Sequence, residues 1–117
     1  MSLTELPRAA WTAALNDFST NHEGWLVTLD VWSPEIGSLP EISDLPLIGV
    51  SADRSASDTC ITVSAAASPD DHASHTIHHP TSVTLERDPN GVAKAMHIES
   101  AGGVKTTLRV RMPSTRD

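Results

Sequence analysis

The spacing of apolar residues changes its period near the start of this chain. From Pro7 to Ser19 it matches one face of a helix, with apolar side chains three or four positions apart and a proline where the first turn tolerates one. The members of this face are Trp11, Ala14, Leu15 and Phe18. From Trp25 to Trp32 apolar and polar residues alternate, which is typical of a strand with one buried face. The pattern therefore predicts one N-terminal helix followed by a strand.

The remaining apolar runs are short and are separated by turn signals. Period-two alternation recurs in residues 45–52, 59–66, 83–86, 92–100 and 104–112, with turns at 53–58, 88–91 and 101–103. Residues 33–44 show no period and indicate a loop, and residues 68–71 resemble the capped start of a short helical turn.

These features predict an α+β domain, in which one N-terminal helix packs on a small, strongly bent antiparallel sheet of about six strands. The turn spacing suggests an Sm-like or SH3-like partly open barrel. We expect the domain to occupy residues 1–112 and residues 113–117 to form a polar tail.

The distribution of charge disfavours some classes of binding partner. The chain has 117 residues, the length of one domain, and a formal net charge of −7. Residues 1–58 hold 9 acids and 2 bases, so the N-terminal half carries the entire net charge. An acidic chain gains no counterion-release affinity for nucleic acid unless its bases cluster, and anionic membranes are disfavoured likewise.

The first residues of the chain and its cysteine content indicate in which cellular compartment the protein is expected. The lone Cys60 excludes an internal disulfide, and the chain start lacks the basic and apolar regions of a secretory leader. No stretch approaches the roughly 20 apolar residues of a membrane span. We therefore expect a cytoplasmic protein without a membrane segment.

The segment 68–80 contains four of the six histidines of the chain. Imidazole is the commonest metal ligand in proteins. A short helical turn would place His72 and His75 on one face, whereas an extended segment would place His75 and His79 on one face. In either arrangement Asp71 is a further ligand, so the candidate site for a divalent metal is His72, His75, His79 and Asp71. A solvated polar loop is the favoured alternative, because no fixed ligand motif is present.

Two features on the predicted strands are candidates for an interaction surface. Trp32 points away from the apolar face of its strand, so it is either covered by the following loop or exposed to a partner. Lys105, Arg109 and Arg111 form a basic stripe on the final strand, where a hairpin would set Glu99 opposite Lys105. The stripe is either a solvated face or a docking site for an acidic loop of a second copy. An exposed final strand would also let two copies pair edge to edge.

Signatures of known catalytic sites are absent from the sequence. It contains no G-x-S-x-G elbow, phosphate-binding glycine loop, C-x-x-C pair or H-E-x-x-H. Cys60 lies in an alternating strand segment, and cysteine is among the most buried residue types, so a structural role is expected for it.

The order of several short motifs resembles a bacterial family whose function is unknown. The motifs are Pro7-Arg8 before Trp11 and Phe18, Gly24 and a strand ending in Asp30, Leu45-Pro-Leu with Gly49 and Asp53, His75-x-Ile77-x-x-Pro80, and Ile98-Glu99 before a Gly hairpin. The resemblance spans nearly the whole chain and implies a small standalone bacterial protein. It implies no activity, cofactor or partner and assigns no functional residues.

The sequence as a whole favours a non-enzymatic cytoplasmic binding or assembly module, with a protein partner or a homodimer preferred over nucleic acid. Two alternatives stay open. One is a metal- or histidine-dependent small enzyme, or a metal-binding protein, that uses segment 70–79. The other is an Sm-like nucleic-acid-binding module that uses the basic stripe, which the acidity and the scarcity of aromatic residues weaken. No cofactor is predicted beyond a divalent metal.

Overall fold

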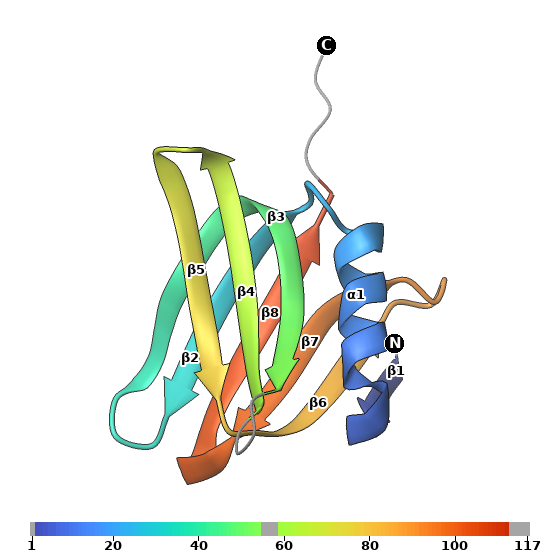
Figure 1. Ribbon diagram of the computed structural model, residues 1–117, viewed down its shortest axis with the longest axis vertical. Helices are drawn as coiled ribbons and strands as arrows, with labels where there is room; N and C mark the ends of the chain where they lie inside the picture. The colour runs from blue at the N-terminus through green and yellow to red at the C-terminus, as the bar shows by residue number, and fades with distance from the viewer. Residues whose placement is uncertain (1, 55–58, 113–117) are drawn as a thin grey trace.

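A computed structural model describes residues 2–54 and 59–112 of the chain (Figure 1). One helix and eight strands follow one another, with a short 3-10 turn before the helix and another before the last strand. In chain order they are β1 (Ser2–Leu6), η1 (Arg8–Ala10), α1 (Trp11–Asn21), β2 (Leu26–Ser33), β3 (Gly37–Arg54), β4 (Thr59–Ser68), β5 (Asp71–His78), β6 (Pro80–Arg87), β7 (Ala93–Ser100), η2 (Ala101–Gly103) and β8 (Val104–Arg111).

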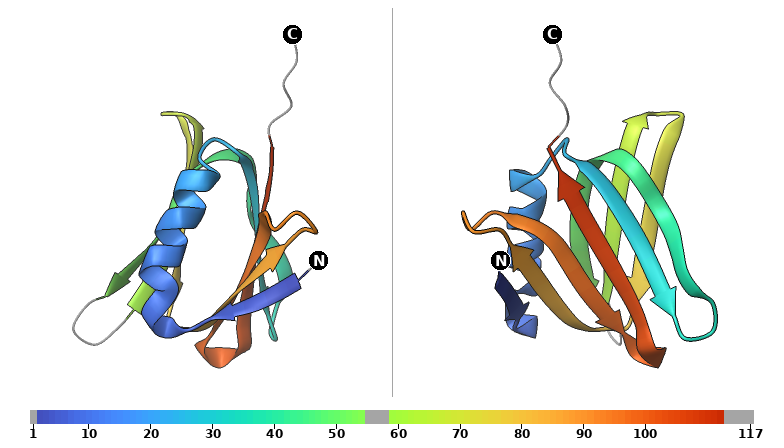
Figure 2. Two further views of the ribbon diagram at one scale, coloured as in Figure 1. Left: turned by 90° about the vertical axis from the view of Figure 1, so that its right-hand side faces the viewer. Right: turned by 180° about the vertical axis from the view of Figure 1, so that it is seen from behind.

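The strands form one antiparallel sheet in the order β1-β6-β7-β8-β2-β3-β4-β5. The long strand β3 belongs to both halves of this sheet, because Gly37–Pro46 pairs with β2 and Leu47–Arg54 pairs with β4. The ladder is irregular near Asp44, whose φ is +52°, and such an irregularity bends a strand. The sheet folds over on itself, so that β4 and β5 lie across from β2 and β8 without closing a barrel (Figures 1 and 2).

The core lies inside this fold and is completed by α1. The helix buries the side chains that its sequence periodicity selects, Trp11, Leu15 and Phe18. The sheet contributes inward-facing residues from both halves, including Val27, Leu29, Ile61, Val63, Ile77, Val83, Met96, Ile98 and Leu108. Burial of apolar surface stabilises the packing of helix and sheet, by roughly 25 cal/mol for each Å² removed from water.

Two polar side chains on α1 fix its position relative to the sheet. Ser19 Oγ accepts the Val50 N–H at 2.7 Å and lies within donating distance of the carbonyl oxygens of Leu15 and Val50, at 2.8 and 2.9 Å. His22, just beyond the last turn, reaches the Ala93 carbonyl of β7. The helix is thereby tied both to β3 and to the opposite half of the sheet.

The predicted α+β class with one N-terminal helix on a bent antiparallel sheet is confirmed, but six strands is an undercount. The predicted loop 33–44 is wrong beyond a short turn, because Gly37 already begins β3. The predicted helical turn after Ser68 is also wrong, since Asp71–His78 is strand β5. The strand β1 was not predicted at all; its five residues pair with β6. Residues 55–58 of the predicted turn and the predicted tail 113–117 lie outside the described residues.

The final strand is not an edge of the sheet. β8 lies between β7 and β2, so the prediction that two copies pair through it is wrong. The two edges are β1 and β5 instead. Sequence alternation locates a strand but does not give its neighbours, which depend on pairing between distant segments.

Candidate binding cleft

A cleft of about 440 Å³ opens between the C-terminal half of α1 and the turn that joins β6 to β7. Its volume lies within the range of small-molecule sites in proteins. The lining residues are Leu6, Ala14, Asp17, Phe18, Asn21, His22, Trp25, Leu85, Arg87, Gly91, Val92 and Ala93. Apolar and aromatic side chains therefore predominate, with polar groups at a few positions.

His22 forms the wall of the cleft where the helix ends. Its side chain is only 3% exposed. Nδ1 lies 2.8 Å from the carbonyl oxygen of Phe18, and Nε2 lies 2.9 Å from that of Ala93. The ring stacks on Phe18 at 4.3 Å between centroids and meets the edge of Trp25 at 4.6 Å. Both ring nitrogens thus face backbone carbonyl oxygens, and a neutral ring, which has one N–H, donates to one of the two. This position makes His22 a structural bridge between α1 and β7.

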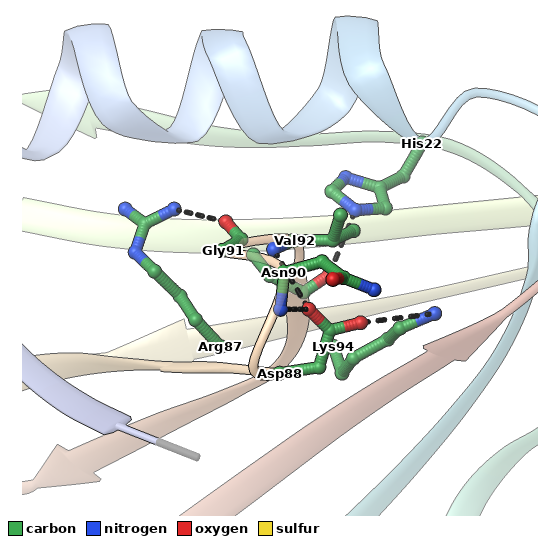
Figure 3. A network of polar contacts seen from close by, with 8 residues as sticks. His22, Arg87, Asp88, Asn90, Gly91, Val92 and Lys94 are labelled. Atoms are coloured by element: carbon green, nitrogen blue, oxygen red, sulfur yellow. Dashed lines mark hydrogen bonds and ion pairs between the residues drawn. The ribbon is translucent and has the colours of Figure 1, made fainter.

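The opposite wall is the turn Asp88–Val92, which a network of hydrogen bonds holds in shape (Figure 3). Asp88 Oδ1 accepts the N–H groups of Asn90 and Val92 at 2.9 and 3.0 Å. Gly91 has a φ of +85°, a conformation that glycine adopts without strain. These contacts hold the backbone on both sides of the turn, so the apolar Val92 is presented at the rim of the cleft by an ordered segment.

Charged side chains surround the mouth of the cleft. Arg87 Nη1 donates to the carbonyl oxygen of Gly91 at 3.4 Å, which draws the guanidinium across the turn. Lys94 Nζ lies 5.1 Å from the ring centroid of Trp25 and 4.0 Å from Asp88 Oδ2. Asp17, at an exposed position of α1, is the one acidic residue that lines the cleft within the described part of the chain. A ligand with an apolar body and a charged end would find both kinds of contact here.

The lining residues supply apolar contacts and few chemically reactive groups. Within the described residues, the cleft wall contains no serine, threonine, cysteine or lysine side chain that would serve as a nucleophile. It contains one carboxylate, Asp17, and not the pair of carboxylates that general acid–base hydrolysis uses.

The structure does not bring the four predicted metal ligands together within one chain. His72 and His75 both lie on β5, but the alternation of the strand places them on opposite faces. His79 follows the strand with a φ of +53°, and Asp71 pairs with Ser68 at the other end of β5. Across residues 2–54 and 59–112 no group of three or more histidine, cysteine, aspartate or glutamate side chains could hold a metal ion.

A contact between Cys60 and His78 was missed by sequence reasoning. Cys60 on β4 lies directly opposite His78 on β5, and Sγ is 3.4 Å from Nδ1. The next outward-facing pair along the hairpin, Thr62 and Thr76, brings two hydroxyl groups within 3.3 Å. A sequence signal existed, because segments 59–66 and 71–78 both alternate, but the turn signal at 68–71 was interpreted as the start of a helix.

The predicted interaction surface lies on the outer face of β2 and β8. Trp32 is 40% exposed, and Lys105, its partner across the ladder, lies 5.7 Å from the ring centroid. The predicted register of Glu99 opposite Lys105 is confirmed. Arg109 is exposed, and Arg111 lies 3.4 Å from the Asp44 carboxylate. The structure therefore groups Trp32 with Lys105, and an acid offsets the charge of Arg111.

The fold and the cleft define a small α+β protein in which one helix packs on a bent antiparallel sheet. Over residues 2–117 the sequence matches the model of a family described as Family of unknown function (DUF5335), and the chain belongs to this family. This agrees with the resemblance drawn from the ordered motifs. No curated protein and no solved structure matches the chain. In the described part of the chain, no helix has the length and apolar character needed to cross a bilayer.

Proposed function

We propose that this protein is a non-enzymatic binding module whose cleft holds a small ligand with an apolar body and one anionic group. The observation that carries this proposal is the apolar cleft between α1 and the ordered β6–β7 turn. Few polar groups converge on it, which is the usual composition of a small-molecule site. The lone cysteine and the acidic composition agree with a role in the bacterial cytoplasm.

The anionic group of the ligand follows from the position of Arg87. Arg87 is the cationic residue among the described lining residues, and its contact with Gly91 engages one of its guanidinium nitrogens. Guanidinium groups bind carboxylates, sulfonates and phosphates with paired, charge-assisted hydrogen bonds. The apolar body of the ligand would contact Phe18, Trp25 and Leu85 below it.

The test uses anilinonaphthalene sulfonate, a fluorescent probe with an aromatic body and one anionic group. We expect saturable binding at one site, with energy transfer from Trp25 to the probe. Ala14→Phe should fill the cleft and reduce affinity at least tenfold. Arg87→Gln should weaken binding by about tenfold to 150-fold, the effect of a charge-assisted hydrogen bond worth about 1.5–3 kcal/mol.

Ala13→Phe is the matched control, because Ala13 is exposed on the same helix and does not line the cleft. It should leave affinity unchanged. Equal affinity of wild type and Ala14→Phe for the probe would overturn the proposal. The proposal would also fail if the probe bound only to samples whose circular dichroism shows loss of the native fold.

The two alternative functions receive less support. A nucleic-acid-binding Sm-like module would use Lys105, Arg109 and Arg111, but Lys105 faces Glu99 and Trp32, and Arg111 faces an acid. A metal enzyme built from His72, His75 and His79 would need these side chains to converge, and His72 and His75 point to opposite faces of β5. The cleft is the better basis for a function.

A further inference from the structure

The outer edge of β5 lacks the devices that usually prevent strands of different molecules from pairing. Natural edge strands carry lysines, prolines or bulges, or are very short. The segment from His72 to His78 contains no lysine, arginine, proline or glycine, and its register with β4 is unbroken. In the described part of the chain no strand pairs with its other side. This edge can therefore accept one more antiparallel strand.

A second copy of β5 is the partner that fits this edge. A two-fold axis perpendicular to the sheet pairs identical edges and keeps both outer faces on the same side. The longest uninterrupted pairing is centred on His75, because His75 is the midpoint of the regular run from His72 to His78. This register also places Asp71 beside the partner's His79, so that the acidic start of each strand meets the histidine-rich end of the other.

The same register brings metal ligands together on the outer face. His72 and His78 both point outward, and the pairing sets His78 opposite the partner's His72, with Cβ atoms about 4.5–5.5 Å apart. On its other side His78 already contacts Cys60. Each dimer would therefore contain two identical rows, each composed of Cys60 and His78 of one protomer and the partner's His72.

The separation of Cys60 and His78 suits a tetrahedral metal ion. Zinc–sulfur bonds of about 2.3 Å and zinc–nitrogen bonds of about 2.0–2.1 Å place two ligands about 3.6 Å apart at the tetrahedral angle. The observed distance from Sγ to Nδ1 is 3.4 Å, so a small rotation of either side chain accommodates the ion. The Cys60 thiol would release its proton to solvent on binding, and water would complete the coordination.

We propose that two copies of this protein pair through β5 and bind one zinc ion per protomer between Cys60, His78 and the partner's His72. One chain alone supplies only two of these ligands, which accounts for the absence of a three-residue metal cluster among the described residues. The site lies on the β4–β5 hairpin and shares no residue with the cleft.

The first experiment measures mass by light scattering and zinc by elemental analysis, on untagged protein with and without a chelator. We expect a 12.5 kDa monomer in chelator, and twice that mass with one zinc per chain after zinc is added. His72→Asn and His78→Asn should each abolish the dimer and reduce bound zinc at least tenfold. His97→Asn is the control, because His97 is a partly exposed histidine on β7, outside the β4–β5 hairpin and the proposed interface, and it should retain both.

A mixing experiment separates a shared site from a site within one chain. His72→Asn retains Cys60 and His78, whereas a Cys60→Ser, His78→Asn double variant retains His72. Neither should dimerise alone, but a 1:1 mixture should form a heterodimer with one intact site and bind half a zinc per chain. Circular dichroism of each variant establishes that it is folded.

Several outcomes would overturn the proposal. These are zinc bound by a monomer, full zinc binding by His72→Asn, failure of the folded variants to complement each other, or an unchanged monomer in the presence of zinc. Cobalt substitution gives an independent readout, because a thiolate ligand produces an intense charge-transfer band that Cys60→Ser should remove. A cobalt complex of the wild-type protein without this band would equally contradict a role for Cys60.

Discussion

At the scale of single residues, His22 shows how one polar side chain can join two elements inside an apolar core. A buried imidazole without partners would cost several kcal/mol, because its ring nitrogens would lose their hydrogen bonds with water. Here the two nitrogens lie within hydrogen-bond distance of the carbonyl oxygens of Phe18 in the helix and Ala93 in β7, and the single N–H of a neutral ring donates to one of them. The ring faces meanwhile contact Phe18 and Trp25. His22 therefore contributes polar and apolar contacts at the same position.

Replacing His22 by phenylalanine separates these two contributions. His22→Phe keeps an aromatic ring between Phe18 and Trp25 but removes the contacts with both carbonyls. We expect the free energy of unfolding to fall by about 1–3 kcal/mol. His22→Ala should cost more, because it also removes the ring and leaves a cavity. Urea unfolding followed by tryptophan fluorescence gives both values, and equal stability of wild type and His22→Phe would show that the polar contacts contribute nothing.

The role of His22 was not visible in the sequence. It is separated from the cluster at 68–80, and although it lies four positions after Phe18, in line with the apolar face, it is a polar residue just beyond the end of the helix. Its partner Ala93 is 71 positions away. The histidines at 68–80 form a visible cluster because they are neighbours in the chain, whereas the role of His22 depends on a contact that only the folded sheet creates.

At the scale of elements, the attachment of α1 to β3 depends on Ser19. Its hydroxyl group accepts the Val50 N–H and lies within donating distance of both the Val50 and Leu15 carbonyls. Gly49 lies beside this contact, where a Cβ would meet Ser19 Oγ at 3.6 Å, an ordinary van der Waals distance. The second half of β3 is paired with β4 on one side, and α1 covers its other side.

Ser19→Ala should weaken this attachment. The Val50 N–H loses its acceptor in a partly buried position, and we expect a loss of about 1–3 kcal/mol in the free energy of unfolding. Thr20→Ala is the matched control, because Thr20 is exposed on the same turn, and its effect should stay within about 0.5 kcal/mol. Chemical denaturation measures both variants, and similar losses in the two would contradict a specific tie to Val50.

The spacing of apolar residues predicted the elements whose own sequence has a clear period. The helix and the strands β2, β4, β7 and β8 carry a clear period, and the structure contains all of them. Strand β3 was recognised only in its second half, because Pro40 and Asp44 interrupt the alternation where the strand bends. The short β1 exists through its pairing with β6, which no local rule reveals.

At the scale of the whole molecule, the two candidate sites depend on tertiary arrangement. The cleft forms because residues near 20 and residues near 90 meet across the core. The pair Cys60 and His78 forms because a hairpin aligns two strands. The sequence predicted a metal site from His72, His75, His79 and Asp71, on either a helical turn or an extended segment. The structure makes this segment strand β5, and it does not bring the four side chains together within one chain.

The order of strands in the sheet also predicts how stability is distributed. β2 and β8 are paired on both sides, whereas β1 and β5 are paired on one side only. Backbone amides of edge strands open more easily, because fewer hydrogen bonds and less burial must be lost. In chelator-treated protein we expect hydrogen exchange to be slowest in β2 and β8 and at least tenfold faster in β5.

Zinc should change this distribution at one edge only. If β5 pairs with its counterpart in a second copy, its outward N–H groups acquire acceptors and their exchange slows, whereas that of β1 stays the same. Exchange measured by mass spectrometry with and without zinc distinguishes the two edges. Slow exchange of β5 in the chelated monomer, or equal protection of both edges by zinc, would contradict assembly through β5. The difference between β5 and β1 in zinc-dependent protection from exchange therefore tests whether two copies associate through β5.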